Sequence, residues 1–207
     1  MSSPVSKSSK RNIFMTTAII GDQQSLFPQI FNHFILLPDF LVVKIQVTKK
    51  GSFMARLENM PEPQRSHIAN TKLPTFDTHP WVDGPALNLR RIAIVSTAGL
   101  HRREDRPFTF EPGDNYRIIP GDTAANDLIM SHASTNFDRS GFQQDWNIVF
   151  PLDRLHELCD EGYVGSVARF HYSFMGAMDP TDLEKSARQL AGLLKDDNVD
   201  GALLVPV

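Results

Sequence analysis

The sequence predicts a single α/β domain built on a parallel sheet, preceded by an irregular N-terminal lead-in. Two observations predict this class. In the second half of the chain, apolar stretches typical of buried strands alternate with two stretches that have the apolar period of a helix. In addition, 207 residues with 41% hydrophobic and 22% charged side chains are enough for one soluble domain with a full core.

Composition divides the chain into residues 1–53, 54–89 and 90–207. Residues 1–53 carry six basic and two acidic side chains of the total of 21 and 24, so the remaining 154 residues carry 15 and 22. Three interpretations of this basic first segment stay open. It is an over-extended gene start with translation beginning at Met54, an organellar targeting segment within residues 1–30, or a structural arm.

Residues 54–89 are expected to form an extended, irregular lead-in. Five prolines fall in this stretch, and proline interrupts a helix because it lacks the backbone N–H and clashes with the preceding turn. We expect this segment to pack Phe76 and Trp81 onto the domain.

The regular domain begins with a strand within RRIAIVSTAGL (residues 90–100). Its apolar run Ile92–Val95 is continuous, as in a central strand that is buried on both faces. Two shorter apolar stretches, Tyr116–Pro120 and Asp127–Ser134, are expected to be strands as well.

The rest of the domain alternates between helices and strands. A helix is predicted within Pro151–Gly162 and a strand over Ser166–Gly176. Thr181 and Glu184 have the spacing of a capping box at the start of a second helix, and VDGALLVPV is the last strand. This alternation predicts a flavodoxin- or Rossmann-like sheet, in which ligands bind beyond the carboxyl ends of the strands.

Composition also excludes several classes of function. The net charge of −3 and pI near 6.1 do not indicate a nucleic-acid-binding protein. The apolar stretch Phe31–Val47 is interrupted by Pro38 and is shorter than the roughly 20 residues of a membrane span.

The single Cys159 cannot form an intramolecular disulfide, which fits the cytoplasm. The seven histidines lack metal-binding spacing, and Gly121–Asp127 lacks the pattern of a phosphate loop. We therefore expect no nucleic acid, membrane, metal or nucleotide cofactor.

Three basic residues, His101, Arg102 and Arg103, follow the first strand and its Gly99 turn. At the carboxyl end of a strand they would meet a substrate, and arginine suits a bidentate contact with a carboxylate. A solvated basic turn, paired with the adjacent Glu104 and Asp105, is the alternative interpretation.

A second group of candidates lies in SHASTNFDRSG (residues 131–141). Its density of hydrogen-bonding side chains suits a binding loop, although the same residue types also form ordinary turns. We predict His132 as a catalytic proton donor or ligand-orienting group. The predicted substrate-binding residues of this loop are Asn136, Asp138 and Arg139.

His171, in the strand-like stretch FHYSFMG, is a further candidate for substrate binding. A histidine within an apolar strand is alternatively a core residue whose hydrogen bonds are satisfied. Tyr172 and Ser173 share both interpretations, whereas His156 and Cys159 are expected to be surface or packing positions on their helix.

Four stretches share a resemblance to a known family: RIAIVSTAGLHRREDRPF, SHASTNFDRSGFQQDWNIVFPLDRLHEL, EGYVGSVARFHYSFMGAMDP and VDGALLVPV. They resemble the selenoprotein B family, which comprises components of glycine/sarcosine/betaine reductase and D-proline reductase. The closest resemblance is to the short bacterial branch. It extends from about Met54 to Val207 and leaves residues 1–53 unmatched.

The resemblance implies a redox function. In the family, the strand that corresponds to GALLVPV continues into a selenocysteine or cysteine, followed three positions later by a second cysteine and then a helix. It therefore implies a selenocysteine directly after Val207, a chain truncated at that position, and no other cofactor within this chain. The implied activity is a reductase that cleaves a carbon–heteroatom bond of a small-molecule substrate with a disulfide/dithiol couple, for which a thioredoxin-like protein is a candidate partner.

Two other functions stay open. The first is a non-catalytic small-molecule-binding or interaction protein that ends at Val207. The second is a hydrolase or lyase that uses His132 and Asp138, although no serine or cysteine nucleophile in a recognisable turn supports it.

Overall fold

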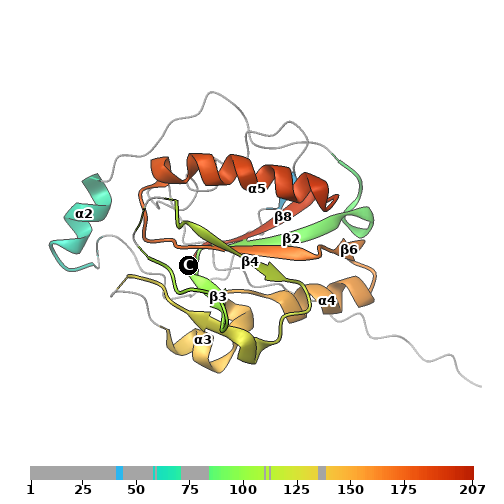
Figure 1. The fold of residues 1–207 in the computed structure, drawn as a ribbon, viewed down its shortest axis with the longest axis horizontal. Coiled ribbons are helices and arrows are strands. Elements are labelled where there is room, and N and C mark those ends of the chain that lie inside the picture. The colour runs from blue at the N-terminus through green and yellow to red at the C-terminus, as the bar shows by residue number, and fades with distance from the viewer. Residues whose placement is uncertain are drawn as a thin grey trace, which may run out of the picture.

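The computed structural model describes a subset of the chain, and the fold is drawn in Figure 1. The described residues are 41–43 as backbone, 58, 60–70, 84–109, 111, 113–134 and 139–207. The predicted contacts of Phe76 and Trp81 lie outside these ranges. The described part of the lead-in includes a short α-helix, α2 (Gln64–Asn70), which the proline pattern did not predict.

A six-stranded mixed sheet forms the centre of the domain, with the order β1–β8–β2–β7–β4 and with β6 beside β2. Four of its strands pair in parallel along this order, and β4 pairs antiparallel with β7. The predicted α/β class is confirmed in this coarse form, whereas the flavodoxin- or Rossmann-like order stays a prediction. The strands are β1 (Leu41–Val43), β2 (Arg91–Ser96), β4 (Tyr116–Pro120), β6 (Ser166–Val167), β7 (Phe170–Phe174) and β8 (Gly201–Val205).

Helices cover both faces of this sheet, α5 on one face and α3 and α4 on the other (Figure 1). The predicted helix within Pro151–Gly162 is confirmed as α4. The helices are α3 (Ser140–Gln144), α4 (Leu152–Asp160) and α5 (Glu184–Asp196), with 3-10 turns at Leu87–Leu89, Ala125–Asp127, Trp146–Ile148 and Pro180–Leu183.

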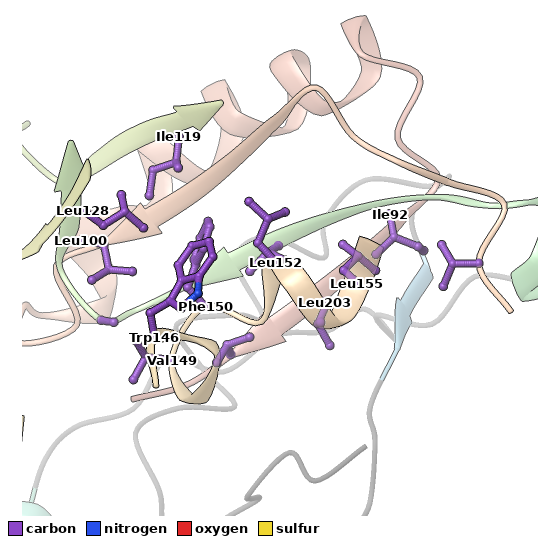
Figure 2. Close-up of a cluster of buried hydrophobic side chains, with 14 residues drawn as sticks. Ile92, Leu100, Ile119, Leu128, Trp146, Val149, Phe150, Leu152, Leu155 and Leu203 are labelled. Atoms are coloured by element: carbon purple, nitrogen blue, oxygen red, sulfur yellow. The ribbon is translucent and has the colours of Figure 1, made fainter. Parts of the chain in front are cut away.

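Strand β2 divides the core in two because successive side chains of a strand point to opposite faces. Ala93 and Val95 pack with the apolar stripe of α5, which includes Leu190. Ile92 and Ile94 pack on the other face, against α4 and the residues before it. Figure 2 shows this second cluster, which includes the side chains of Trp146, Phe150, Leu152, Leu155 and Leu203 on the same face of the sheet.

The start of α5 differs from the predicted capping box. Thr181 lies in a 3-10 turn that precedes the helix, and its backbone N–H and hydroxyl both donate to the carboxylate of Asp179, at 2.9 and 2.7 Å. Glu184 is the first residue of α5 and pairs with Arg188. The prediction was wrong because aspartate competes well for the same N-terminal N–H groups.

One predicted strand region belongs to a separate antiparallel ribbon, together with a strand that was not predicted. Strand β3 (Leu100–Arg102) pairs with β5 (Leu128–Met130), and the pair lies outside the main sheet. The expected strand over Asp127–Ser134 is therefore confirmed only in its first part. Its last residues continue beyond the ribbon as a loop, and this loop carries His132.

A buried carboxylate joins three elements at the amino end of the sheet. Asp197, whose side chain is 4% exposed, lies between α5 and β8. It accepts hydrogen bonds from Arg91 at 2.8 Å and from the Arg169 side chain and backbone N–H at 2.9 and 2.7 Å. Burial raises the pKa of this carboxyl, but the hydrogen bonds from both arginines outweigh burial and lower it below the ordinary 3.8.

Replacing Asp197 with asparagine is expected to lower the free energy of unfolding at pH 7 by about 2–4 kcal/mol, because two arginines lose a buried anionic partner. A carboxyl with a lowered pKa stabilises the fold above its unfolded-state pKa and loses this effect as pH falls through the folded-state value. The difference between wild type and D197N should therefore shrink below pH 3.8. Urea denaturation at several pH values measures it.

The matched control is E184Q, which removes the exposed Glu184–Arg188 pair on α5. Exposed ion pairs contribute less than about 1 kcal/mol. An equal loss in D197N and E184Q would contradict a special role for the buried carboxylate.

Candidate functional site

The carboxyl ends of three parallel strands meet at one edge of the sheet. β2 pairs with β7 on one side and with β8 on the other, with Ser96 beside both Ser173 and Val205. The chain leaves β2 toward the face covered by α4 and leaves β7 toward the face covered by α5. Neighbouring strands whose connections diverge in this way leave a ligand-binding position between them.

Thr97, the residue after β2, ties these strand ends together. Its backbone N–H donates to Val205 at 3.1 Å, and its carbonyl accepts from Gly176, after β7, at 3.1 Å. Its hydroxyl accepts from the backbone N–H of Val207 at 2.9 Å. Thr97 is fully buried, so the position of the β8 end depends on an interior hydroxyl group. Sequence analysis missed this residue, although it belongs to the small residues that follow the first strand.

His132 lies beside this junction and is 6% exposed. Its Nδ1 accepts a hydrogen bond from the backbone N–H of Ser134 at 3.2 Å, so the proton of the neutral ring is on Nε2. Nε2 faces the junction, because a Cβ atom at Gly176 would lie 3.2 Å from it. Burial, and secondarily the charge of Arg139, lower the pKa of His132. At neutral pH the site therefore holds a neutral imidazole that presents an N–H group.

Two glycines allow this close approach. A Cβ at Gly176 would lie 2.7 Å from the Thr97 carbonyl oxygen, which is closer than side chains tolerate. Gly99 has a φ of +64°, and a Cβ there would lie 3.0 Å from the Cα of His132. Glycine is favoured at Gly176 because it carries no Cβ, and at Gly99 for the same reason and because it readily adopts positive φ.

The loop residues predicted with His132 are only partly described. Arg139 lies next to His132, and its guanidinium donates to the His132 carbonyl at 2.5 Å. This contact fixes the backbone of the loop at the site. Asn136 and Asp138 lie outside the described residues, so their substrate contacts stay predictions.

The three basic residues of the β3 region are held by protein partners. Arg102 forms ion pairs with Glu104 at 2.6 Å and with Asp105 at 3.2 Å, and Arg103 donates to the backbone carbonyl of Asn126 at 2.8 Å. The arrangement of Arg102 matches the alternative interpretation of a basic turn. Both arginines support the ribbon, and their contact with substrate stays a prediction.

His101 is not brought together with His132. It pairs with Ile129 across the ribbon, and its two ring nitrogens contact the Arg102 carbonyl and the Ser131 hydroxyl rather than His132. The imidazole is 2% exposed and contacts the Ser131 hydroxyl. The contact of His101 with substrate stays a prediction.

His171 lies in the interior of the domain and is fully buried. Between the pairs Ile92–Val167 and Val95–Tyr172, β2 has two residues whereas the opposite strand has four. The irregularity breaks the strand into β6 and β7, and the backbone N–H of Ile94 donates to His171 Nδ1 at 2.9 Å. Desolvation, as the largest cause, lowers the pKa of His171 to about 3. The imidazole thus replaces a missing backbone acceptor of the sheet and lies apart from the His132 site.

The other candidates occupy packing or surface positions. His156, exposed on α4, is hydrogen-bonded to the Gly121 carbonyl at 3.0 Å. Cys159 is a free thiol 3.8 Å from the carbonyl of Gly165. Among the described residues, no three histidine, cysteine, aspartate or glutamate side chains are grouped closely enough to bind a metal, and none of the helices described is long and apolar enough to cross a membrane.

These observations define an α/β domain with a histidine site at the carboxyl edge of its parallel strands. The sequence profile of the glycine/sarcosine/betaine reductase selenoprotein B family matches residues 69–207, more than half of the chain. The chain belongs to this family.

One curated relative is the D-proline reductase subunit gamma of Acetoanaerobium sticklandii. It is 32% identical over 115 residues, which cover 55% of this chain and 47% of the relative. The chain thus spans about half the length of the relative that it matches. No solved structure matches the chain.

Replacing His171 with leucine is expected to lower the free energy of unfolding by about 2–3 kcal/mol, because the N–H of Ile94 would be buried without an acceptor. H171N should lose less, since the asparagine oxygen can occupy the position of Nδ1. A histidine whose folded-state pKa is lowered stabilises the fold above its unfolded-state pKa. Wild type should therefore lose stability as pH falls from 6.5 toward about 3.

Thermal melting between pH 7 and pH 5 measures this effect, with H171N as the matched comparison. H171N cannot take up the proton and should depend less on pH in this range. An unchanged pH dependence in H171N would exclude His171 as its source.

Proposed function

We propose that this chain contributes the substrate-proximal site of a selenol- or thiol-dependent reductase, whose redox residue directly follows Val207. The observation that carries the proposal is the convergence of the β8 end and His132 at Thr97. The Thr97 hydroxyl accepts a hydrogen bond from the Val207 N–H at 2.9 Å. Gly176 donates its backbone N–H to the Thr97 carbonyl and also lies close to His132 Nε2. A residue after Val207 would continue from this junction, which favours its contact with His132.

Selenocysteine or cysteine suits this position chemically. The anionic form is the nucleophile, and its formation is favoured by hydrogen-bond donors and by a following helix N-terminus. In the proposed reaction a carbon–heteroatom bond breaks, and C–H and heteroatom–H bonds form. A dithiol supplies the two electrons and two protons and is left as a disulfide, with an intermediate selenenyl-sulfide or disulfide resolved by a second cysteine.

His132 is the proposed proton donor or orienting group of this reaction. Its neutral imidazole presents the Nε2–H toward the junction, where it can stabilise negative charge that develops on the leaving heteroatom. The contact from Arg139 to the His132 carbonyl supports the loop. Arg139, which was predicted to bind substrate, contacts His132 directly. It is an exposed residue, and its guanidinium suits an anionic group of the substrate.

The proposed substrate is a small molecule of the class reduced by the family, and its identity is tested below. The relative is named as one subunit of a reductase, which favours an assembly with further subunits. A thioredoxin-like protein is the proposed source of the dithiol, and the proposed location is the cytoplasm, where thiols are kept reduced.

The first test of the proposal is to determine the gene sequence beyond codon 207. A UGA or cysteine codon at position 208, a cysteine codon at 211 and an apolar-periodic helix after it are expected. Another residue at position 208 would refute the proposed redox step. The structure would then favour the alternative of a small-molecule-binding protein that uses the same edge.

The second test uses the complete gene product and measures reduction of D-proline, glycine, sarcosine and betaine with dithiothreitol as the electron donor. His132→Asn should lower kcat about 100-fold or more, since general acid groups contribute about 10²–10⁴-fold. Asparagine retains an acceptor near the Nδ1 position for the Ser134 N–H but lacks the Nε2–H.

His132→Gln, which can place an amide N–H near the Nε2 position, should recover part of the activity. His156→Ala, on the exposed face of α4, is the control and should retain wild-type turnover. Equal kcat values for H132N and wild type would contradict the role proposed for His132.

A further inference from the structure

Ser131 and His101 form a hydrogen-bonded pair at one end of the ribbon. His101 pairs with Ile129 across the ribbon, so Ser131 lies on the same face, two residues further along its strand direction. The Ser131 hydroxyl oxygen is 2.8 Å from Nε2 of His101. A serine and a histidine at this distance are within reach for proton transfer.

The backbone determines the direction of this hydrogen bond. Nδ1 of His101 is 2.7 Å from the carbonyl oxygen of Arg102, and a carbonyl oxygen can only accept. Nδ1 therefore carries the proton of the neutral ring, and Nε2 presents a lone pair. The hydroxyl of Ser131 must then be the donor to Nε2, so the imidazole is oriented as a base.

The histidine of this pair is buried, whereas its serine is a partly exposed residue. His101 is 2% exposed, and the ring of Phe108 lies edge-on to it with a centroid distance of 6.4 Å. Phe108 is itself fixed by the guanidinium of Arg117, 4.3 Å from its ring centroid. Ser131 is partly exposed, and its backbone N–H is fixed by the carbonyl of Gly99 at 2.9 Å. A reagent in solution can thus approach the serine, while its base stays oriented.

We propose that Ser131, with His101 as its general base, is a nucleophile that accepts an acyl group from an activated ester or thioester. The Ser131 oxygen bonds to the carbonyl carbon as its proton moves to Nε2 of His101. The bond from that carbon to the leaving alcohol or thiol then breaks, and the leaving group takes the proton from His101. Hydrolysis of the resulting serine ester by water repeats these steps and restores the hydroxyl.

The Arg102 carbonyl, which is the partner of His101 Nδ1, limits which acyl donors can react with Ser131. A carboxylate behind Nδ1 would stabilise the charged imidazolium, but the carbonyl of Arg102 is neutral and mainly orients the ring. The pair should therefore act on donors with a good leaving group, such as aryl esters and thioesters, and not on amides. This activity requires neither His132 nor a residue after Val207, so it is independent of the reductase proposal.

A fluorophosphonate probe tests the proposal on the full 207-residue chain. The probe reacts with activated serines by forming an oxygen–phosphorus bond and releasing fluoride. We expect a single adduct, located on Ser131 by peptide mass spectrometry of the wild-type protein. Ser166, a partly buried serine in β6, is the internal control in the same peptide map and should stay unmodified.

Two variants assign the role of the base. Ser131→Ala should lose the adduct, and His101→Gln should label at least tenfold more slowly. Glutamine retains an acceptor for the serine hydroxyl but cannot take up its proton. Circular dichroism melting verifies that both variants fold. The peptide map of the wild-type protein identifies the labelled residue independently of the variants. Absence of an adduct on Ser131, or equal rates in wild type and H101Q, would overturn the proposal.

Discussion

Strand β2 is the element on which the rest of the domain depends, because it is paired on both edges and buried on both faces. Its neighbours β7 and β8 are connected by α5, which crosses one face, while the chain that leaves β2 covers the other. A one-residue shift in the register of β2 would move apolar residues between the two cores. The position of Thr97, and with it the candidate site, follows from this fixed register.

The two ends of the sheet are fixed by different chemistry. At the amino end, the Asp197 carboxylate joins Arg91 and Arg169 through charge-assisted hydrogen bonds. At the carboxyl end, the junction is neutral and is made by the hydroxyl and backbone of Thr97. A neutral junction leaves no fixed charge to compete with an anion that forms there, whereas the same carboxylate placed at this end would oppose a selenolate or thiolate. The charge distribution is therefore compatible with the proposed reductase site.

The sequence predicted α4 and α5 from their apolar period, and β2, β4 and β8 from their apolar runs. It predicted a strand where β5 lies, but it predicted neither β3 nor the pairing of the two, because the three residues of β3 have no period to detect. It identified His132, but Thr97 carries no signal that separates it from other small residues after a strand. The irregularity at His171 is equally hidden, because it depends on a contact between residues 77 positions apart in the chain. Local patterns predict elements, whereas a site depends on which elements become neighbours.

Which ring nitrogen of a histidine carries the proton also depends on which elements become neighbours. His132 and His171 both accept a backbone N–H at Nδ1, so each carries its proton on Nε2 and can only donate there. His101 donates from Nδ1 to a carbonyl and therefore accepts at Nε2. The partner of Nδ1 is a backbone group in every case, so the fold decides which imidazole is a donor and which is a base. Three residues of one type thereby acquire three roles: a hydrogen-bond donor at the strand ends, an acceptor that completes the sheet, and a base beside a serine.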